Sequence, residues 1–285
     1  MTLIADLPGR LPARGQAQPA ARRRPRSPGP ATGGTLLISL ATATALFGLW
    51  FAATRYEWSS PLFLPSPAEV LDQFIAVAKD GYADATLGEH VLASLGRIAA
   101  ALAFAVALGV PLGLAMGLNR WAKGIFSVPI DLYWGLPPLA YLPLLINWLG
   151  IGETSKIVQQ TLATFAPVCL SAQAGVRAVP VERLNAALSL GASRLQLFTS
   201  VILPSALPEI LTGVRIAVAA GWGTLVAAEL IAARSGVGYM IMSAANFLAT
   251  DVVFVGLVVI AAFAFASSAG LRWLERRLVP WKGKL

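Results

Sequence analysis

The sequence predicts an all-α integral membrane protein, and three observations lead to that prediction. Of the 285 residues, 56% are hydrophobic and only 13% are charged, whereas a soluble domain carries roughly 25% charged residues. The mean hydropathy is +0.69. Several uncharged runs approach the roughly 20 residues that an α-helix needs to cross a bilayer. Much of the surface is therefore expected to face lipid, with six transmembrane helices.

The six apolar segments alternate with polar connections, which gives the expected order of elements. The spans are expected at residues 35–53, 98–118, 124–149, 157–176, 210–232 and 252–271. A basic, Pro- and Gly-rich stretch over residues 1–34 is expected to be a disordered cytoplasmic tail. Residues 54–88 are expected to carry a surface helix over Ala68–Lys79. Another short helix is expected within 233–251, and residues 276–285 are expected to form the second tail.

The second and third spans carry residues that favour packing inside protein. Gly109, Gly113 and Gly117 share one helical face, a pattern that lets two membrane helices approach closely. The segment 124–149 is interrupted by prolines, which free backbone groups that lipid cannot satisfy. We expect this third span to pack against protein or to line a cavity. Its prolines are Pro129, Pro137, Pro138 and Pro143.

The distribution of basic residues predicts the orientation of the chain. If the spans alternate, sixteen Lys and Arg residues lie on the side of both termini and five lie on the other side, with Arg215 inside the fifth span left out. Cytoplasmic loops carry such an excess. Both termini are therefore expected in the cytoplasm. The net charge of +8 then reflects membrane orientation, and no nucleic-acid partner is expected.

The polar stretch Glu182–Pro204, ERLNAALSLGASRLQLFTSVILP, separates two apolar spans and is expected on the cytoplasmic side. It is predicted to form two short amphipathic pieces joined at Gly191, because glycine adopts a positive φ without strain. Pro204 is predicted to end the second piece, since proline disfavours the helical conformation in the residue before it. Such a loop is a candidate contact for a partner protein.

Motifs for catalysis and for metal or nucleotide binding are absent from the sequence. There is no P-loop, and a lone His90 cannot form a metal site; we expect His90 at the membrane interface. The single Cys169 excludes an internal disulfide. The chain is therefore predicted not to be an enzyme and to hold no cofactor, so any work against a gradient needs energy from a partner.

Polar side chains within the spans are the candidates for a solute pathway. Asp131 and Arg215 lie close to span ends and are interpreted as structural, with Arg215 reaching the headgroups. Trp222 lies between Gly221 and Gly223 at mid-span, which favours either a gate beside a solute path or tight helix packing. The candidate pathway residues are Gln160, Gln173, Trp222, Thr224 and Glu229.

The loop Glu182–Pro204 resembles the permease signature of binding-protein-dependent ABC importers. That signature is E-A-A, a glycine four residues after the last alanine, and a terminal I-x-L-P. In this sequence Asn185 stands where the signature has its glutamate, and Val201 stands where it has its isoleucine. Glu182, one turn before Asn185, is the candidate to supply the missing carboxylate. The residues that the resemblance implies for contact with the ATPase are Glu182, Asn185, Ala186, Ala187, Gly191, Ala192, Leu203 and Pro204.

The resemblance extends over residues 85–275 and implies a type I importer permease core over 89–275. LPPLAYLPLLINWLGIGETSKI is similar to the sulfonate, nitrate and bicarbonate branch, and the stretch from Leu203 to the end resembles taurine permeases. The resemblance implies a multi-pass protein of the bacterial inner membrane, paired with a second copy. A cytoplasmic ABC ATPase dimer would bind ATP and Mg²⁺, and a periplasmic binding protein would deliver the solute to surface helices around Leu71 and Met240.

Alternatives remain open from the sequence. Within the importer family, aliphatic sulfonates and nitrate or bicarbonate compete with taurine as the solute. A membrane scaffold without transport would have no need for the alanine–glycine spacing in the loop. A secondary transporter usually carries ionisable residues at mid-membrane, whereas the charged residues here lie near span ends.

Overall fold

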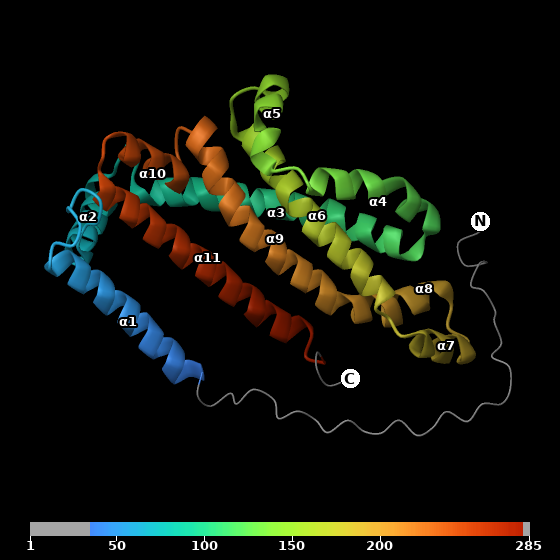
Figure 1. Cartoon of the computed structure of the whole chain (residues 1–285). Helices are drawn as coiled ribbons and strands as arrows, with labels where there is room; N and C mark the ends of the chain where they lie inside the picture. Colours follow the sequence, from blue (N-terminus) through green and yellow to red (C-terminus); the bar gives the residue numbers. More distant parts are fainter. Residues whose placement is uncertain (1–34, 282–285) are drawn as a thin grey trace. The chain divides into compact units, whose positions relative to one another are not determined.

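The computed structural model describes residues 35–281, which form helices joined by short connections (Figure 1). The expected tail 1–34 lies outside the described residues. The chain divides between Ser59 and Ser60 into two compact units, which are described separately. The helices are α1 (Thr35–Arg55), α2 (Pro67–Asp80), α3 (Leu87–Leu118), α4 (Arg120–Trp134), the 3-10 helix η1 (Pro138–Ala140), α5 (Leu142–Leu149), α6 (Glu153–Arg177), α7 (Val181–Ser189), α8 (Arg194–Gln196), the π-helix η2 (Leu197–Ile202), α9 (Leu203–Ala232), α10 (Val237–Asn246) and α11 (Thr250–Leu278).

Helix α1 belongs to the first unit and carries no charged residue before Arg55. Its large side chains are exposed, with Leu37 at 70% and Phe47 at 57%. Apolar side chains on all faces are typical of a helix that lipid surrounds.

Local sequence explains where α2 and α3 begin. Ser66 accepts a hydrogen bond from the backbone N–H of Glu69, and the Glu69 carboxylate accepts one from the backbone N–H of Ser66. Thr86 and Glu89 repeat this arrangement at the start of α3. Each capping box satisfies two N–H groups that would otherwise lack helical partners. Helix α3 therefore begins at Leu87, well before residue 98.

Helix α6 forms the centre of the second unit and packs against both α3 and α9. Glycines allow the close approach on both sides. A Cβ added to Gly113 of α3 would lie 2.7 Å from the Ala172 Cβ of α6, and one added to Gly213 of α9 would lie 2.6 Å from the Ser171 Oγ of α6. The expected small-residue face of α3 thus lies against α6, and its glycines let the two helices approach closely.

The segment 124–149, in which the third span is expected, is not one continuous helix. Helix α4 ends at Trp134, η1 begins at Pro138, and α5 begins at Leu142. Proline disfavours the helical conformation in the preceding residue and lacks an N–H, so Pro137 and Pro138 break the helix. Pro129 remains inside α4.

Four described helical stretches are long and apolar enough to cross a membrane: Leu37–Arg55, Leu87–Leu118, Arg194–Leu230 and Thr250–Leu278. A fifth is added when α6 and α7, which meet at a 60° bend, are counted as one span. The broken segment α4–α5 is the remaining candidate, so six spans stay a prediction. Helix α11 continues to Leu278, beyond the residue at which the second tail was expected to begin.

Candidate functional site

The loop 182–204 is folded and packed against the ends of α6 and α9. It contains α7, α8 and η2, at the opposite end of the second unit from α10 (Figure 1). Val179, Leu197 and Ile202 are buried together, and Leu184 and Ala187 of α7 pack against them. The apolar side of α7 is therefore anchored against the segments that adjoin α6 and α9.

The alanine–glycine spacing of the loop has a backbone explanation. Gly191 has φ +80°, its N–H donates to the Leu188 carbonyl at 2.9 Å, and the Ala192 N–H donates to the Ala187 carbonyl at 3.1 Å. These two bonds form a Schellman motif, which closes a helix with a left-handed residue four positions after the first acceptor. A Cβ on Gly191 would meet nothing within 4 Å. The glycine is thus required by its backbone conformation and not by space.

The second half of the loop is continuous with α9, which corrects the expected role of Pro204. Ser193 caps the new helix through a capping box with Gln196. Helical backbone then runs from Arg194 through the π-helix η2 and α9 as one span to Leu230. Pro204 lies in the first turn of α9, where its missing N–H coincides with the π-helical bonding of the preceding turn. It does not end a helix.

The predicted ATPase-contact residues divide into an exposed and a packed set. Glu182, Asn185, Ala186 and Gly191 are exposed, and Leu190 beside them is 89% exposed. The other predicted residues are half-buried at the base of the loop: Ala187, Ala192, Leu203 and Pro204. The exposed set forms a surface of polar and small residues beside the exposed apolar side chains of Leu188 and Leu190, and this surface is accessible to another protein.

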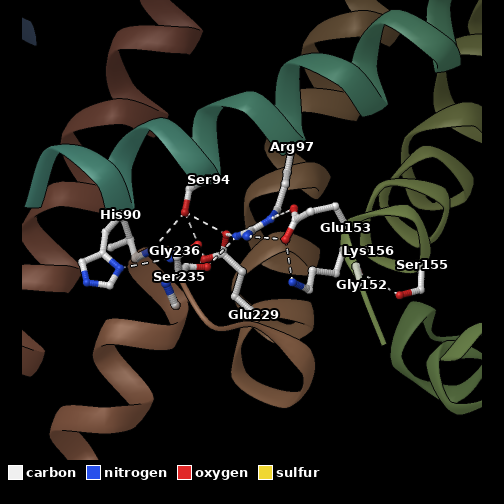
Figure 2. Close-up of polar contacts among 12 residues, drawn as sticks. His90, Ser94, Arg97, Gly152, Glu153, Ser155, Lys156, Glu229, Ser235 and Gly236 are labelled. Carbon is white, nitrogen blue, oxygen red and sulfur yellow. Dashed lines mark hydrogen bonds and ion pairs between the residues drawn. The ribbon is translucent and has the colours of Figure 1, made fainter. Parts of the chain in front are cut away.

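Arg97 of α3 joins three helices through a network of charged groups (Figure 2). Its Nε and Nη2 donate to the two carboxylate oxygens of Glu153, at the start of α6, at 2.6 and 2.8 Å. Its Nη1 donates to Oε1 of Glu229, near the end of α9, at 2.5 Å and to the Ser235 carbonyl at 2.8 Å. Lys156 Nζ donates to Glu153 Oε1 at 2.8 Å. Two cations thus balance two carboxylates, which is the condition for burying charge.

The carboxylate of Glu229 has further donors from α3 and from the first turn of α10. Ser94 Oγ donates to it at 2.8 Å, and the Gly238 N–H donates to its Oε2 at 2.8 Å. Gly236 has φ +128°, and a Cβ there would lie 2.5 Å from Glu229 Cδ and 2.6 Å from Arg97 Nη1. Only glycine fits this backbone conformation and this space together.

His90 is fully buried inside the protein, and its expected place at the depth of the membrane interface stays a prediction. Its Nδ1 receives the Gly236 N–H at 3.1 Å, and its Nε2 lies 2.9 Å from the Tyr82 carbonyl oxygen. An amide N–H can only donate and a carbonyl can only accept, so the geometry assigns a neutral imidazole with its proton on Nε2. His90 therefore connects α3 to the turns at Tyr82 and Gly236, and Figure 2 shows the contact with Gly236.

The predicted pathway residues do not all lie together: Gln160 and Thr224 meet at the Gly221 carbonyl, whereas Gln173 and Glu229 lie elsewhere. Gln160 Nε2 donates to the Gly221 carbonyl at 3.1 Å. Trp222 is 6% exposed and packs with Ile98 and Leu225, and Glu229 belongs to the Arg97 network. Gln160 Oε1 and Trp222 Nε1 are buried without a hydrogen-bond partner among the described residues.

Thr224 Oγ1 also donates to the Gly221 carbonyl, at 3.1 Å, and Thr224 borders a cavity of about 240 Å³ between the broken segment α4–α5 and helices α6 and α9. Three aromatic rings contribute to its wall. The lining residues are Tyr133, Trp134, Leu136, Pro138, Tyr141, Leu162, Ala163, Ala220 and Thr224. Gln173 is more than two helical turns further along α6 and does not line the cavity.

The two residues interpreted as structural have weak polar contacts. Asp131 is exposed, and Ser127 Oγ donates to its carboxylate at 3.3 Å. Arg215 Nη1 lies 3.9 Å from Glu275 Oε2 of α11.

Sequence reasoning missed Arg97, Glu153 and Lys156 as members of a site. It used Arg97 and Lys156 only to count charges on each side of the membrane. Arg97 is separated from Glu153 by 56 residues and from Glu229 by 132, so no local motif connects them. The available signal was the isolated charge of each residue close to an apolar helix.

Comparison with known proteins identifies the family. The model for "Binding-protein-dependent transport system inner membrane component" matches residues 109–280. The chain is 54% identical over 249 residues to the taurine transport system permease protein TauC of Escherichia coli K12, covering 87% of this chain and 90% of that protein. It is 38% identical to the putative aliphatic sulfonates transport permease protein SsuC of the same organism, covering 83% and 88%.

Solved structures with a similar fold are also transporters. An inward-facing form of the MetNI methionine ABC transporter matches with a TM-score of 0.60 and 18% identity, over 67% of this chain and 95% of that one. An amino acid ABC transporter with histidines matches with a TM-score of 0.53 and 19% identity, over 75% and 95%. At these identities the likeness shows the fold alone, whereas the family model covers more than half of the sequence. The chain therefore belongs to the family of binding-protein-dependent transport system inner-membrane components.

Proposed function

We propose that this chain is the permease subunit of an ATP-driven importer for taurine in a bacterial inner membrane. The observation that carries the proposal is its 54% identity to TauC over 87% of the chain and 90% of that protein. Aliphatic sulfonates are the second candidate, supported by the 38% identity to SsuC. Both candidate solutes carry a sulfonate group, so the two hypotheses differ only in the rest of the solute molecule.

Three partners complete the importer. A cytoplasmic ABC ATPase dimer binds and hydrolyses ATP, a periplasmic binding protein delivers the solute, and a second copy of this chain encloses the pathway. The second copy is supported by the break over residues 135–141, where Leu136 and Leu139 are exposed. Irregular backbone at membrane depth must be covered by protein or line water, and a second copy would supply that cover.

The loop 182–204 is proposed as the contact with the ATPase. Its support is the combination of an exposed surface at Glu182, Asn185 and Leu190 with an anchored apolar side at Leu184 and Ala187. A partner that moves this exposed surface would move the ends of α6 and α9 with it, because buried cores deform little.

The Arg97 network is proposed to hold the other end of these helices together. Arg97 contacts α6 through Glu153 and α9 through Glu229. Because only 3% of its side chain is exposed, water does not solvate the guanidinium charge. Breaking either contact would leave a buried charge without its partner. Movement started at the loop would therefore carry α3, α6 and α9 as one body, with the adjustment left to the broken segment α4–α5.

The cavity beside Thr224 is proposed as part of the solute path. Its support is its place against the broken segment, where a second copy would also lie, and its mixed wall of aromatic rings and a hydroxyl. A small zwitterion fits such a wall, since rings attract an ammonium group and the hydroxyls of Tyr133 and Tyr141 can donate to a sulfonate. Gln160, Gln173, Trp222 and Glu229 are assigned as supports for the helices that border it.

Uptake by the complete complex tests the function. The chain, its ATPase and its binding protein are reconstituted in liposomes, and ATP-dependent uptake of taurine, an alkanesulfonate and nitrate is compared. We expect taurine to be taken up fastest, and only when ATP and binding protein are both present. Preference for the alkanesulfonate would select the second candidate, and absence of any ATP-dependent uptake would refute the importer.

A further inference from the structure

A second pocket lies between α9 and α11, close to the described C-terminal end and far along α9 from Glu229. Its volume is about 380 Å³. Three of its lining residues are arginines and one is a carboxylate, so it carries a formal excess of two positive charges. The lining residues are Arg215, Arg272, Glu275, Arg276, Val279 and Pro280.

The arginines are held in place by contacts that leave their donors in excess. Arg272 Nη1 donates to Ser268 Oγ, one turn earlier on α11, at 2.7 Å. Arg215 of α9 and Glu275 of α11 are 3.9 Å apart, too far for a strong hydrogen bond. Each guanidinium has five N–H donors, and one carboxylate cannot neutralise three of them. Among the described residues, the pocket therefore offers more donors and more positive charge than its lining side chains use.

The pocket lies at the depth of a headgroup layer. The stretch of α11 from Thr250 to Arg272 is about 33 Å long at 1.5 Å per residue, close to the roughly 30 Å thickness of the hydrocarbon core. Trp273, next to Arg272, is 60% exposed and carries the Arg277 guanidinium 5.4 Å from its ring. An exposed tryptophan at this position is typical of the membrane interface.

We propose that this pocket binds a phosphate-class oxyanion, presented by the headgroup of an anionic phospholipid. The planar guanidinium group of arginine donates two parallel hydrogen bonds to a pair of phosphate oxygens. Anionic lipids are concentrated in the leaflet beside which Lys and Arg residues gather. The headgroup phosphate would lie between Arg215 of α9 and Arg272 of α11 and connect the two helices. The site does not depend on which solute the importer carries.

Lipid binding to the assembled importer tests this site. The purified complex in neutral detergent receives phosphatidylglycerol, phosphatidylcholine or inorganic phosphate, and its thermal unfolding midpoint and retained lipid (by native mass spectrometry) are measured. We expect phosphatidylglycerol to be retained and to raise the midpoint, and phosphatidylcholine to do neither. The double variant R215Q/R272Q is expected to weaken the apparent affinity for phosphatidylglycerol by at least about tenfold, since two charge-assisted bonds are lost.

Matched variants keep the test decisive. R277Q removes one positive charge from the same helix outside the pocket, and it should retain the response to the lipid. If R215Q/R272Q fails to fold, the single variant R276Q is measured in its place. A shift caused by inorganic phosphate alone, and lost in R215Q/R272Q, would support the oxyanion site with a free anion as its source. Equal retention of phosphatidylglycerol by wild type, R277Q and R215Q/R272Q would overturn the proposal.

Discussion

Arg97 and Glu229 form an ion pair at 2.5 Å between α3 and α9, and neither side chain is more than 3% exposed. Removing two charges from water costs several kcal/mol for each ion, which their mutual attraction repays only when the geometry is good and the other polar atoms are satisfied. Glu153, Ser94 and the Gly238 N–H supply those remaining partners. The pair is thus better explained by a need to fix three helices in one arrangement than by net stabilisation.

Glu229→Gln should destabilise the protein by about 3 kcal/mol, because it leaves the buried Arg97 guanidinium with one carboxylate fewer. The thermal unfolding midpoint of the purified complex measures this effect, and uptake should fall with it. Glu209→Gln is the matched control: Glu209 is exposed on the same helix, so its substitution should change stability by less than about 0.5 kcal/mol.

The double variant R97M/E229M separates a pairing effect from a packing effect. Removing both charges leaves no buried charge at these two positions, while Glu153 keeps Lys156 as its partner. We expect the double variant to be more stable than the sum of the two single effects predicts. Simple additivity of R97M and E229M would contradict the account of the two side chains as a coupled pair.

Gly236→Ala should disrupt the same network without removing a charge. The added Cβ would collide with the Glu229 carboxylate and the Arg97 guanidinium, at a residue whose φ is already +128°. We expect a loss of stability of roughly 1–3 kcal/mol together with reduced uptake. Gly223→Ala, in the interior of α9, is the control because a Cβ there meets nothing within 4 Å. Equal unfolding midpoints for the two variants would show that Gly236 is not constrained as described.

Features set by neighbouring residues were predictable from the sequence. The capping boxes at Ser66 and Thr86 follow a local rule, and the glycine-rich face of α3 follows the helical period. The turn at Gly191 was also predictable, because the Schellman motif needs only one residue with positive φ at a fixed distance from the helix end.

Features set by distant residues were not predictable. No local pattern indicates that His90 is buried between the turns at Tyr82 and Gly236, since neither turn can be placed without the packing of α3 against α9. The prediction for Pro204 failed for a related reason. Proline biases the residue before it, but the π-helical turn in η2 absorbs this effect and lets the helix continue.

Gly191→Ala tests the backbone requirement at the loop. A Cβ would meet no neighbour, so the whole cost comes from the left-handed conformation at φ +80°, about 1–2 kcal/mol for a residue other than glycine. Asparagine tolerates this region better, so Gly191→Asn should retain more binding-protein-stimulated ATPase activity than Gly191→Ala. Gly124→Ala, at an open helical position, should behave as wild type. The opposite order of Asn and Ala would exclude the conformational explanation.

Glu182→Lys tests whether this exposed carboxylate of α7 replaces the acid that the family signature has at position 185. The side chain is exposed and lies one turn before Asn185 on the same helix, so charge reversal should not affect folding. We expect the variant chain to retain less ATPase during purification and to lose uptake in proportion. Glu209→Lys, also exposed, introduces the same charge change outside the loop and should retain the ATPase.

Restoring the acid at position 185 makes the test specific. If the ATPase recognises a carboxylate on this face of α7, adding Asn185→Glu to Glu182→Lys should recover retention of the ATPase, because the two positions are three residues apart and share one helical face. A double variant as defective as Glu182→Lys alone would show that the lysine itself obstructs docking. Unchanged retention in Glu182→Lys would show that Leu190 and the small residues of the loop suffice for contact without any acid.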